Sequence, residues 1–253
     1  MKQSDDQHPE CTHCIITNTK RMTMAQSPLQ VGNLVQPIAH VDVPQRTDYE
    51  GKFIRLSPVN PQTDVTELYK CSHGSDIKAQ IWTYMSYGPF DDEHSMHKWL
   101  EEKAKSEDPL FFTVHHLESK QHVGMVSFLN IVSDMRRLEL GHIWYSPDSQ
   151  RSNVNTEAIY LMLCEAFDKL QYRRVEWKCD ALNKRSRAAA LRLGFKFEGI
   201  FRQHIIVKGR NRDTAWYSML DSEWAAIKEN MEMWLYQNPD QKLSLTSLNK
   251  GEI

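Results

Sequence analysis

The sequence lacks the features that mark several classes of protein. No apolar run reaches the roughly 20 residues that a membrane-spanning helix needs, and the first residues, MKQSDDQHPE, lack the apolar segment of a secretory signal. The formal net charge is only −2, so no overall positive field is available to hold a nucleic-acid backbone. We therefore expect neither a membrane nor a nucleic acid as a partner, and a cytoplasmic location with the nucleus open by diffusion.

Cysteine is also scarce. The five cysteines are odd in number and too few for a disulfide framework, which fits a reducing compartment. Cys11 and Cys14, with His8 nearby, could supply part of a zinc site, but a structural zinc site needs four ligands and no second cluster has a suitable spacing. We expect no metal and interpret this segment as a polar tail that holds two thiols.

The chain divides into three parts by composition. Residues 1–50 hold few apolar residues in no clear period, with Pro28, Pro37 and Pro44 interrupting, and are typical of a flexible N-terminal extension. Residues 51–236 carry the periodic patterns of a folded domain, and residues 237–253 are expected to form a polar C-terminal tail. The sequence as a whole is 40% hydrophobic and 25% charged, which is ordinary for a globular protein with a sizeable core.

Hydrophobic periodicity predicts the order of elements within the domain. A strand at 52–56 and helices over 64–69 and 91–103 precede three strand-like runs at 110–116, 122–131 and 136–145, which predict antiparallel hairpins. An apolar stripe over 159–170 predicts a helix, and the strand at 174–180 then requires a parallel crossover. A helix from residue 183, strands near 195–206 and 214–220 and a helix over 221–236 complete an α/β (α+β) fold with a mixed, mostly antiparallel central sheet flanked by helices.

The segment NKRSRAAALRLGFKFEGIFR, residues 183–202, is the most informative part of the chain. Asn183 is suited to cap a helix, strong helix formers follow it, and Gly194 fits the left-handed position that ends a helix before Phe195 begins a strand. Asn, then Ser three residues later, then Gly-Phe resembles the closing helix and strand of the GNAT superfamily of acetyl-CoA-dependent N-acetyltransferases, in its RimJ/RimL-type branch. The resemblance covers residues 51–236 and implies the GNAT fold, in which a splayed pair of central strands holds acetyl-CoA.

The resemblance also implies where acetyl-CoA binds. Family members hold its pyrophosphate on backbone N–H groups of a loop that enters the long central helix, and its pantetheine arm on the central strand. The family's loop reads Gln/Arg-x-x-Gly-x-Gly/Ala, whereas this chain has Arg151, Asn153 and Asn155 where glycine or alanine is common. The loop is therefore interpreted either as a retained acetyl-CoA site or as an ordinary helix start, capped by Asn155 or Thr156. The contacts expected are Ile143, Trp144, Tyr145, Gln150, Arg151, Ser152, Asn153, Val154, Asn155, Thr156, Asn183 and Ser186.

Two residues of the central strand are candidates for the general base that takes the proton of the acceptor amine. Glu139 is the first choice, since related enzymes often use a carboxylate on this strand, although it could simply pair with Arg136 or Arg137. His142 is the second choice because its intrinsic pKa is more suitable, although a strand histidine is more often packed in a core. Strand alternation predicts one face with Glu139, Gly141, Ile143 and Tyr145, and the other with His142 and Trp144.

Ser186 is the predicted proton donor to the departing thiolate. Many GNAT enzymes place a tyrosine where this chain has Ala190, and the RimJ/RimL-type branch has instead a serine three residues after the capping asparagine, which is Ser186 here. Local capping of the helix is the alternative role for this serine.

The residues expected on the acceptor side are aromatic or charged. Trp82, Tyr84 and Trp144 could stack on a substrate, with core packing as the alternative; the residues that could fix a carboxylate or an amine are Arg202, Arg212 and Asp213. The acceptor is expected to be a small-molecule or amino-acid-like primary amine, with a protein N-terminus as the alternative. A non-catalytic module that binds acyl-CoA or a protein is the alternative from another class, and a homodimer is compatible with the resemblance.

Overall fold

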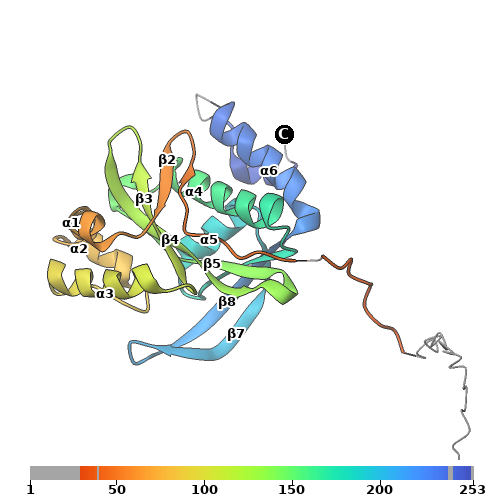
Figure 1. Ribbon diagram of the computed structural model, residues 1–253, viewed down its shortest axis with the longest axis horizontal. Coiled ribbons are helices and arrows are strands. Elements are labelled where there is room, and N and C mark those ends of the chain that lie inside the picture. The colour runs from red at the N-terminus through yellow and green to blue at the C-terminus, as the bar shows by residue number, and fades with distance from the viewer. Residues whose placement is uncertain (1–28, 39, 239–241, 252–253) are drawn as a thin grey trace, which may run out of the picture. The chain divides into compact units, whose positions relative to one another are not determined.

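An eight-stranded sheet forms the centre of the fold (Figure 1). The structure is a computed structural model that describes residues 29–38, 40–238 and 242–251. The chain divides into two units, Met1–Ile38 and Ala39–Ile253, and the elements below belong to the second. In the first unit, the described residues 29–38 form no helix or strand. The Cys11 and Cys14 pair lies outside the described residues.

The strands of the sheet follow the order β1-β2-β3-β4-β5-β6-β8-β7. Only the β5 and β6 pair is parallel, and the other neighbours are antiparallel. The predicted fold class, a mixed and mostly antiparallel sheet flanked by helices, is therefore confirmed. The bounds are β1 Tyr49–Glu50, β2 Ile54–Pro58, β3 Leu110–His116, β4 Gln121–Val132, β5 Arg137–Tyr145, β6 Arg174–Asp180, β7 Lys196–Val207 and β8 Arg210–Leu220.

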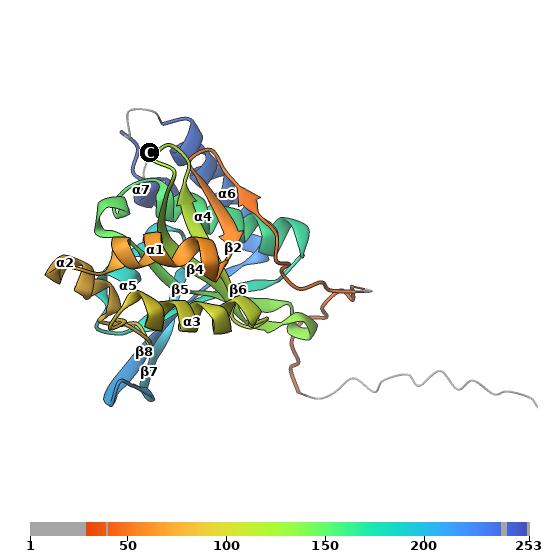
Figure 2. The ribbon, with the colours of Figure 1, turned by 60° about the vertical axis from the view of Figure 1, so that its left-hand side comes forward.

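Helices cover both faces of the sheet (Figure 2). On one face, α1 and α3 pack over a core cluster that contains Phe111, Met125 and Trp144, while α4 and α6 pack over a larger cluster on the other face. Beyond α1 and α3, the β7 and β8 hairpin extends away from the rest of the sheet (Figure 1). The helices are α1 Pro61–Ser72, α2 Asp76–Ala79, η1 Gln80–Trp82, α3 Glu93–Lys105, α4 Val154–Leu163 with its π-helical continuation η4 Cys164–Lys169, α5 Lys184–Arg192, α6 Asp221–Tyr236 and α7 Leu245–Lys250, and short 3-10 turns η2 Ser133–Met135 and η3 Pro147–Ser149 flank β5.

Two elements lie outside the expected domain limits. Strand β1 falls within the segment expected to be a flexible extension, because Tyr49 pairs with Leu56 and packs its ring edge on Phe112. Helix α7 falls within the segment expected to be a polar tail. Its Leu245 is 2% exposed, and the Asn249 side chain donates a hydrogen bond to a backbone carbonyl of α5. Both elements are too short to show a period in the sequence.

The carboxylate of Glu157 ties three elements together. It lies fully buried in the first turns of α4 and accepts hydrogen bonds from the backbone N–H groups of residues 52, 53 and 54 at 2.7–2.8 Å. The Tyr236 hydroxyl at the end of α6 donates a fourth bond at 3.0 Å. A side chain at Gly51 would meet this carboxylate at 2.4 Å. The Glu157 carboxylate therefore fixes the start of β2 against α4 by accepting from these three backbone N–H groups.

Replacing Glu157 by glutamine is expected to lower the free energy of unfolding by about 2–4 kcal/mol, because the amide presents an N–H₂ group to backbone donors that need an acceptor. Chemical denaturation measures the loss. The matched variant Tyr236→Phe removes one of the four bonds and is expected to cost about 1 kcal/mol. Equal losses in the two variants would contradict a special role for the carboxylate.

Candidate functional site

The parallel strands β5 and β6 separate partway along their length. They pair from Arg137 and Arg174 to Leu140 and Trp177, and β5 then continues to Tyr145 without β6 as a neighbour. The N–H and C=O groups on the β6 side of residues 141–145 are therefore not paired with another strand. This opening in the middle of the sheet is a place where an extended ligand can bind through main-chain hydrogen bonds.

A β-bulge accompanies the opening. In the pairing of β4 with β5, Gly141 lies opposite Ser127 and Trp144 opposite Met125, so two residues of β5 share the interval of one residue of β4. His142, the first of the two, has a φ of +51°. The insertion reverses the side-chain alternation beyond it.

The predicted division of the central strand into two faces holds within residues 142–145 but is wrong for Glu139, because the bulge shifts the alternation between Glu139 and those residues. Ile143 and Tyr145 pack into the cluster under α4, whereas Trp144 belongs to the cluster under α1 and α3. The His142 ring lies on that second side, with its centroid 4.8 Å from that of Phe111. Glu139 and His142, predicted on opposite faces, thus lie on the same face of the sheet.

Glu139 sits at the last paired residues of β5 and is 5% exposed. Its Oε2 accepts hydrogen bonds from Asn130 Nδ2 at 2.6 Å and from Lys178 Nζ at 2.8 Å. Burial raises the pKa of the Glu139 carboxyl, and the charge of Lys178 opposes that rise. The second oxygen, Oε1, has no hydrogen-bond donor in the described part of the chain and lies 3.8 Å from where a Cβ of Gly141 would stand. One carboxylate oxygen is therefore anchored, and the other remains able to accept a proton.

His142 is half-buried between aromatic rings. Phe111 and Tyr87 flank it at centroid distances of 4.8 and 5.5 Å. Burial lowers the pKa of the imidazole to about 4, and the positive charges of Lys103 and Arg212 add to the effect. The ring is therefore neutral near pH 7, and its surroundings favour the packing role that was the alternative for this residue.

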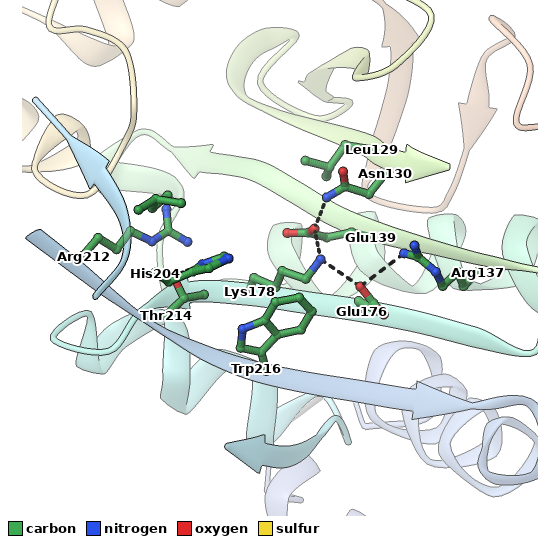
Figure 3. Close-up of a pocket in the computed structure, with 11 residues that line it drawn as sticks. Leu129, Asn130, Arg137, Glu139, Glu176, Lys178, His204, Arg212, Thr214 and Trp216 are labelled. Atoms are coloured by element: carbon green, nitrogen blue, oxygen red, sulfur yellow. Dashed lines mark hydrogen bonds and ion pairs between the residues drawn. The ribbon is translucent and has the colours of Figure 1, made fainter. Parts of the chain in front are cut away.

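A pocket of about 530 Å³ is lined by residues of β4, β5, β6, β7 and β8. Glu139 and Lys178 lie on its floor, at the point where β5 and β6 separate. Figure 3 shows Asn130, Glu139 and Arg137 toward one end and Arg212 with His204 toward the other. The lining residues are Leu129, Asn130, Arg137, Glu139, Glu176, Lys178, His204, Ile205, Arg212, Thr214 and Trp216.

The loop that enters α4 is ordered by its own side chains. Gln150 Nε2 donates to the carbonyl of Tyr145 at 3.1 Å, and Ser152 Oγ accepts from Val154 N at 3.2 Å. Asn153 is the N-cap residue but makes no side-chain capping bond. The expected capping by Asn155 or Thr156 is wrong, because both lie inside the helix and the Thr156 hydroxyl accepts from Arg192 Nη1 at 2.9 Å.

The geometry of this loop fits the pyrophosphate of acetyl-CoA. Within the described residues, the backbone N–H groups of Asn155 and Thr156 have no protein acceptor, and they stand at the positive end of the α4 dipole. Arg151 adopts the left-handed conformation with a φ of +61° and an exposed side chain. The two backbone N–H groups therefore remain available to an anion, although Asn153 and Asn155 stand where the family has small residues.

Ser186 lies beside the separated strands. Asn183 Oδ1 accepts from the backbone N–H of Ser186 at 3.1 Å, which is the predicted cap of α5. Ser186 Oγ in turn accepts from the indole Nε1 of Trp177 at 3.0 Å. Trp177 is the last residue of β6 paired with β5. The hydroxyl keeps its own hydrogen for donation, and the neighbouring thiol of Cys179 is one group within its reach.

Of the six residues expected to contact the acceptor, Arg212 lines the pocket and the other five do not. Trp82 and Trp144 are 1% and 3% exposed, with ring centroids 5.3 Å apart, so they are core residues and the expectation that they stack on a substrate is wrong. Tyr84 donates from its hydroxyl to the carbonyl of Leu182 at 3.3 Å, near the start of α5. Asp213 accepts from Gln203 N at 2.7 Å, which shapes the β7 and β8 hairpin. The remaining two are Arg202, which is exposed on β7, and Arg212, which lines the pocket.

Two residues that shape the site were not identified from the sequence. Lys178 bridges Glu139 and Glu176 at 2.8 Å each, and Arg192 joins α5 to the first turn of α4. The alternation of charged and apolar residues along β6, which reads RVEWKCD, was the available signal for the first. The second carries no signal, because one arginine in a helix with several is not distinctive.

Comparison with known proteins gives the family. The acetyltransferase (GNAT) domain matches residues 54–196, and the chain belongs to this family. A GCN5-related N-acetyltransferase from Brucella melitensis is 40% identical, with a TM-score of 0.78, over 82% of this chain and 96% of that one. The microcin C7 self-immunity acetyltransferase MccE, solved with acetyl-CoA and AMP, is 25% identical with a TM-score of 0.60, over 67% of this chain and 93% of that one.

A curated relative points to the same branch. The Bacillus subtilis (strain 168) protein named "Putative ribosomal N-acetyltransferase YdaF" is 32% identical over 42% of this chain and 57% of its own length. The predicted membership in the RimJ/RimL-type branch is thus confirmed, and the protein is an acetyl-CoA-dependent N-acetyltransferase.

The described residues contain neither a membrane-spanning helix nor a metal cluster. None of their helices combines the length and apolarity that a bilayer crossing requires. The same residues contain no group of three His, Cys, Asp or Glu side chains placed to hold a metal ion.

A second half-buried histidine lies away from the pocket. His115 on β3 packs edge to face on His122 of β4, with ring centroids 4.3 Å apart, and Asp64 lies 3.8 Å from His122. Burial lowers the pKa of His115 to about 4, and His122 adds to the effect.

Acid is therefore expected to destabilise the fold through His115 and His142. Their folded pKa values of about 4 lie below the ordinary value of 6.5, so the unfolded chain binds more protons between these limits and the free energy of unfolding falls as pH drops from about 6.5 to 4. Chemical denaturation at stepped pH measures the slope. His142→Asn, which keeps a residue tolerant of positive φ, is expected to flatten it, and identical slopes would contradict the assignment.

Proposed function

We propose that the acceptor is a small, amino-acid-like primary amine, bound in the pocket over β5, β6 and β8, and that Glu139 is the general base. The observation that carries this proposal is the state of the Glu139 carboxylate. Oε2 is fixed by Asn130 and Lys178, and Oε1 is unpaired beside Gly141, where the two strands separate. A base needs this combination of fixed position and free lone pair.

The electrostatics of Glu139 suit the task. An ordinary carboxylate is a weak base near pH 7, and burial strengthens it by raising its pKa. Lys178 keeps the group ionised in the resting state, since it lies 2.8 Å away and is itself 11% exposed. Glu139 therefore accepts the proton of the acceptor ammonium, through Oε1 or one intervening water, as the amine attacks.

Acetyl-CoA, when bound, supplies an activated acetyl thioester. The unpaired N–H groups at the start of α4 would hold its pyrophosphate, and the main chain of Ile143 and Tyr145 its pantetheine arm. Ser186 is placed to donate its hydroxyl hydrogen to the departing sulfur, because Trp177 Nε1 donates to its oxygen and the O–H, which also has the Cys179 thiol within reach, is left as the donor.

A protein N-terminus is the second candidate acceptor. The observation that favours it is the likeness to YdaF, whose name refers to the ribosome. The pocket volume of about 530 Å³ favours the small amine, because ligand pockets of about 300–1,000 Å³ enclose small molecules. A folded protein would have to present its terminus past the β7 and β8 hairpin.

Glu139→Gln is expected to lower kcat for thiol release from acetyl-CoA by about 10²–10⁴-fold with any productive small amine, because an amide cannot take the proton. Stabilisation by acetyl-CoA, about 2.7 kcal/mol at 100 times its dissociation constant, is expected to persist in the variant. The matched variant is Glu198→Gln, which changes a carboxylate paired with Arg174 outside the pocket.

Three results would contradict the proposal in different ways. Full activity in Glu139→Gln removes this residue from the role of base. Thermal stabilisation by acetyl-CoA together with release only on peptides replaces the small amine by a protein N-terminus. Stabilisation without release on any amine or peptide supports the non-catalytic module.

A further inference from the structure

The charged side chains of the pocket pair with one another, with one exception. Lys178 bridges Glu139 and Glu176, and Arg137 lies 3.9 Å from Glu176. Arg212, on β8, has no carboxylate within 4 Å and no hydrogen-bond acceptor among the described residues, although it lines the same pocket. The pocket therefore holds one cation whose counter-charge the protein does not supply.

Burial makes the unpaired state of Arg212 costly. Its Nε is inaccessible to solvent and has no partner, and a buried donor without an acceptor costs about 1–3 kcal/mol, more when the group is charged. A guanidinium presents its donors in a planar fork that matches a carboxylate. A ligand carboxylate in the pocket would supply the counter-charge that Arg212 lacks among the described residues.

The position of Arg212 places such a carboxylate near the chemistry. Its charge acts on His142 of β5 and on Cys179 of β6, which lie on the two sides of the strand opening. Beside it, His204 Nδ1 and Thr214 Oγ1 form a hydrogen bond at 3.0 Å and complete this end of the pocket. Figure 3 shows Glu139 toward the opposite end of the pocket. The pocket is thus negative where an amine must lose its proton and positive across from it.

We infer that Arg212 is a specificity-determining residue that binds the carboxylate of an acceptor whose amine faces Glu139, so that the substrate class is a free amino acid or an amino-acid derivative with its carboxylate intact. This inference rests on the proposed function. The acceptor lies with its two opposite charges matched to the two ends of the pocket. Leu129 and Ile205, the apolar members of the lining, are available for its side chain.

The test uses matched pairs of acceptors with the full-length protein. Each pair is an amino acid and its carboxamide, which share the amine and the side chain and differ in the carboxylate. Thiol release from acetyl-CoA gives kcat/KM for both members at one pH. The amine of a carboxamide is less basic and carries more of the reactive free form, so amine basicity cannot produce a preference for the acid.

In the wild-type protein, the acid is expected to exceed its carboxamide in kcat/KM by about 10-fold or more, the range of a charge-assisted pair. Arg212→Gln is expected to abolish this ratio through a rise in the KM of the acid. Arg212→Lys is expected to retain part of it. The control is Arg210→Gln, an exposed residue on the same strand outside the pocket lining, which is expected to keep the full ratio.

The outcomes separate this inference from the proposed function. Release from both members of a pair at equal kcat/KM, or an unchanged ratio in Arg212→Gln, overturns the carboxylate assignment and leaves the small-amine proposal standing. If Arg212→Gln does not fold, the wild-type ratio and Arg212→Lys still decide the question. No release from any member of any pair, with acetyl-CoA still stabilising the protein, overturns both.

Discussion

The separation of β5 from β6 is the constraint on which the rest of the structure depends. A parallel pair that continued to Tyr145 would satisfy its own main chain and leave no place for a ligand. Pairing ends at Leu140 and Trp177, and the bulge at His142 turns the rest of β5 away from the register that β6 would need. Because the strands separate after Leu140 and Trp177, Glu139 lies at one edge of the opening. Trp177 holds Ser186 at the other side through its hydrogen bond.

The charges around the opening explain why it is stable. Taking Glu139, Lys178 and Glu176 out of water is costly, and their mutual bonds at 2.8 Å offset that cost only while all three are present. Arg174 adds a bond to Glu176 and fixes Glu198 with two more. These charged groups are partnered within the network. Two groups of the pocket keep unused hydrogen-bonding capacity among the described residues: one oxygen of Glu139 and the guanidinium of Arg212. Both face the same pocket, which is why we assign the acceptor's amine to one and its carboxylate to the other.

Local signals in the sequence predicted what depends on local structure. Asn183 caps α5 as expected, Gly194 has a φ of +93° where a left-handed residue was expected, and the periodic segments became the strands and helices of the sheet. Three features depend on distant contacts, so local signals in the sequence did not predict them. The bulge at His142 adds one residue to the register, which no hydrophobic pattern shows. Lys178 meets Glu139 across 39 positions of sequence. Trp82 and Trp144 meet in a core that only the packing of η1 on β5 defines.

The pH dependence of kcat/KM in the wild type and in Lys178→Gln tests the central claim most directly, that Glu139 is the base and Lys178 holds it ionised. Removing the cation removes the interaction that lowers the pKa of Glu139, so the account predicts that the acidic limb of the profile moves to higher pH in the variant, with the fold verified by circular dichroism. An acidic limb at the same pH in both proteins would contradict the claim, because the group that titrates would then lie outside the reach of Lys178.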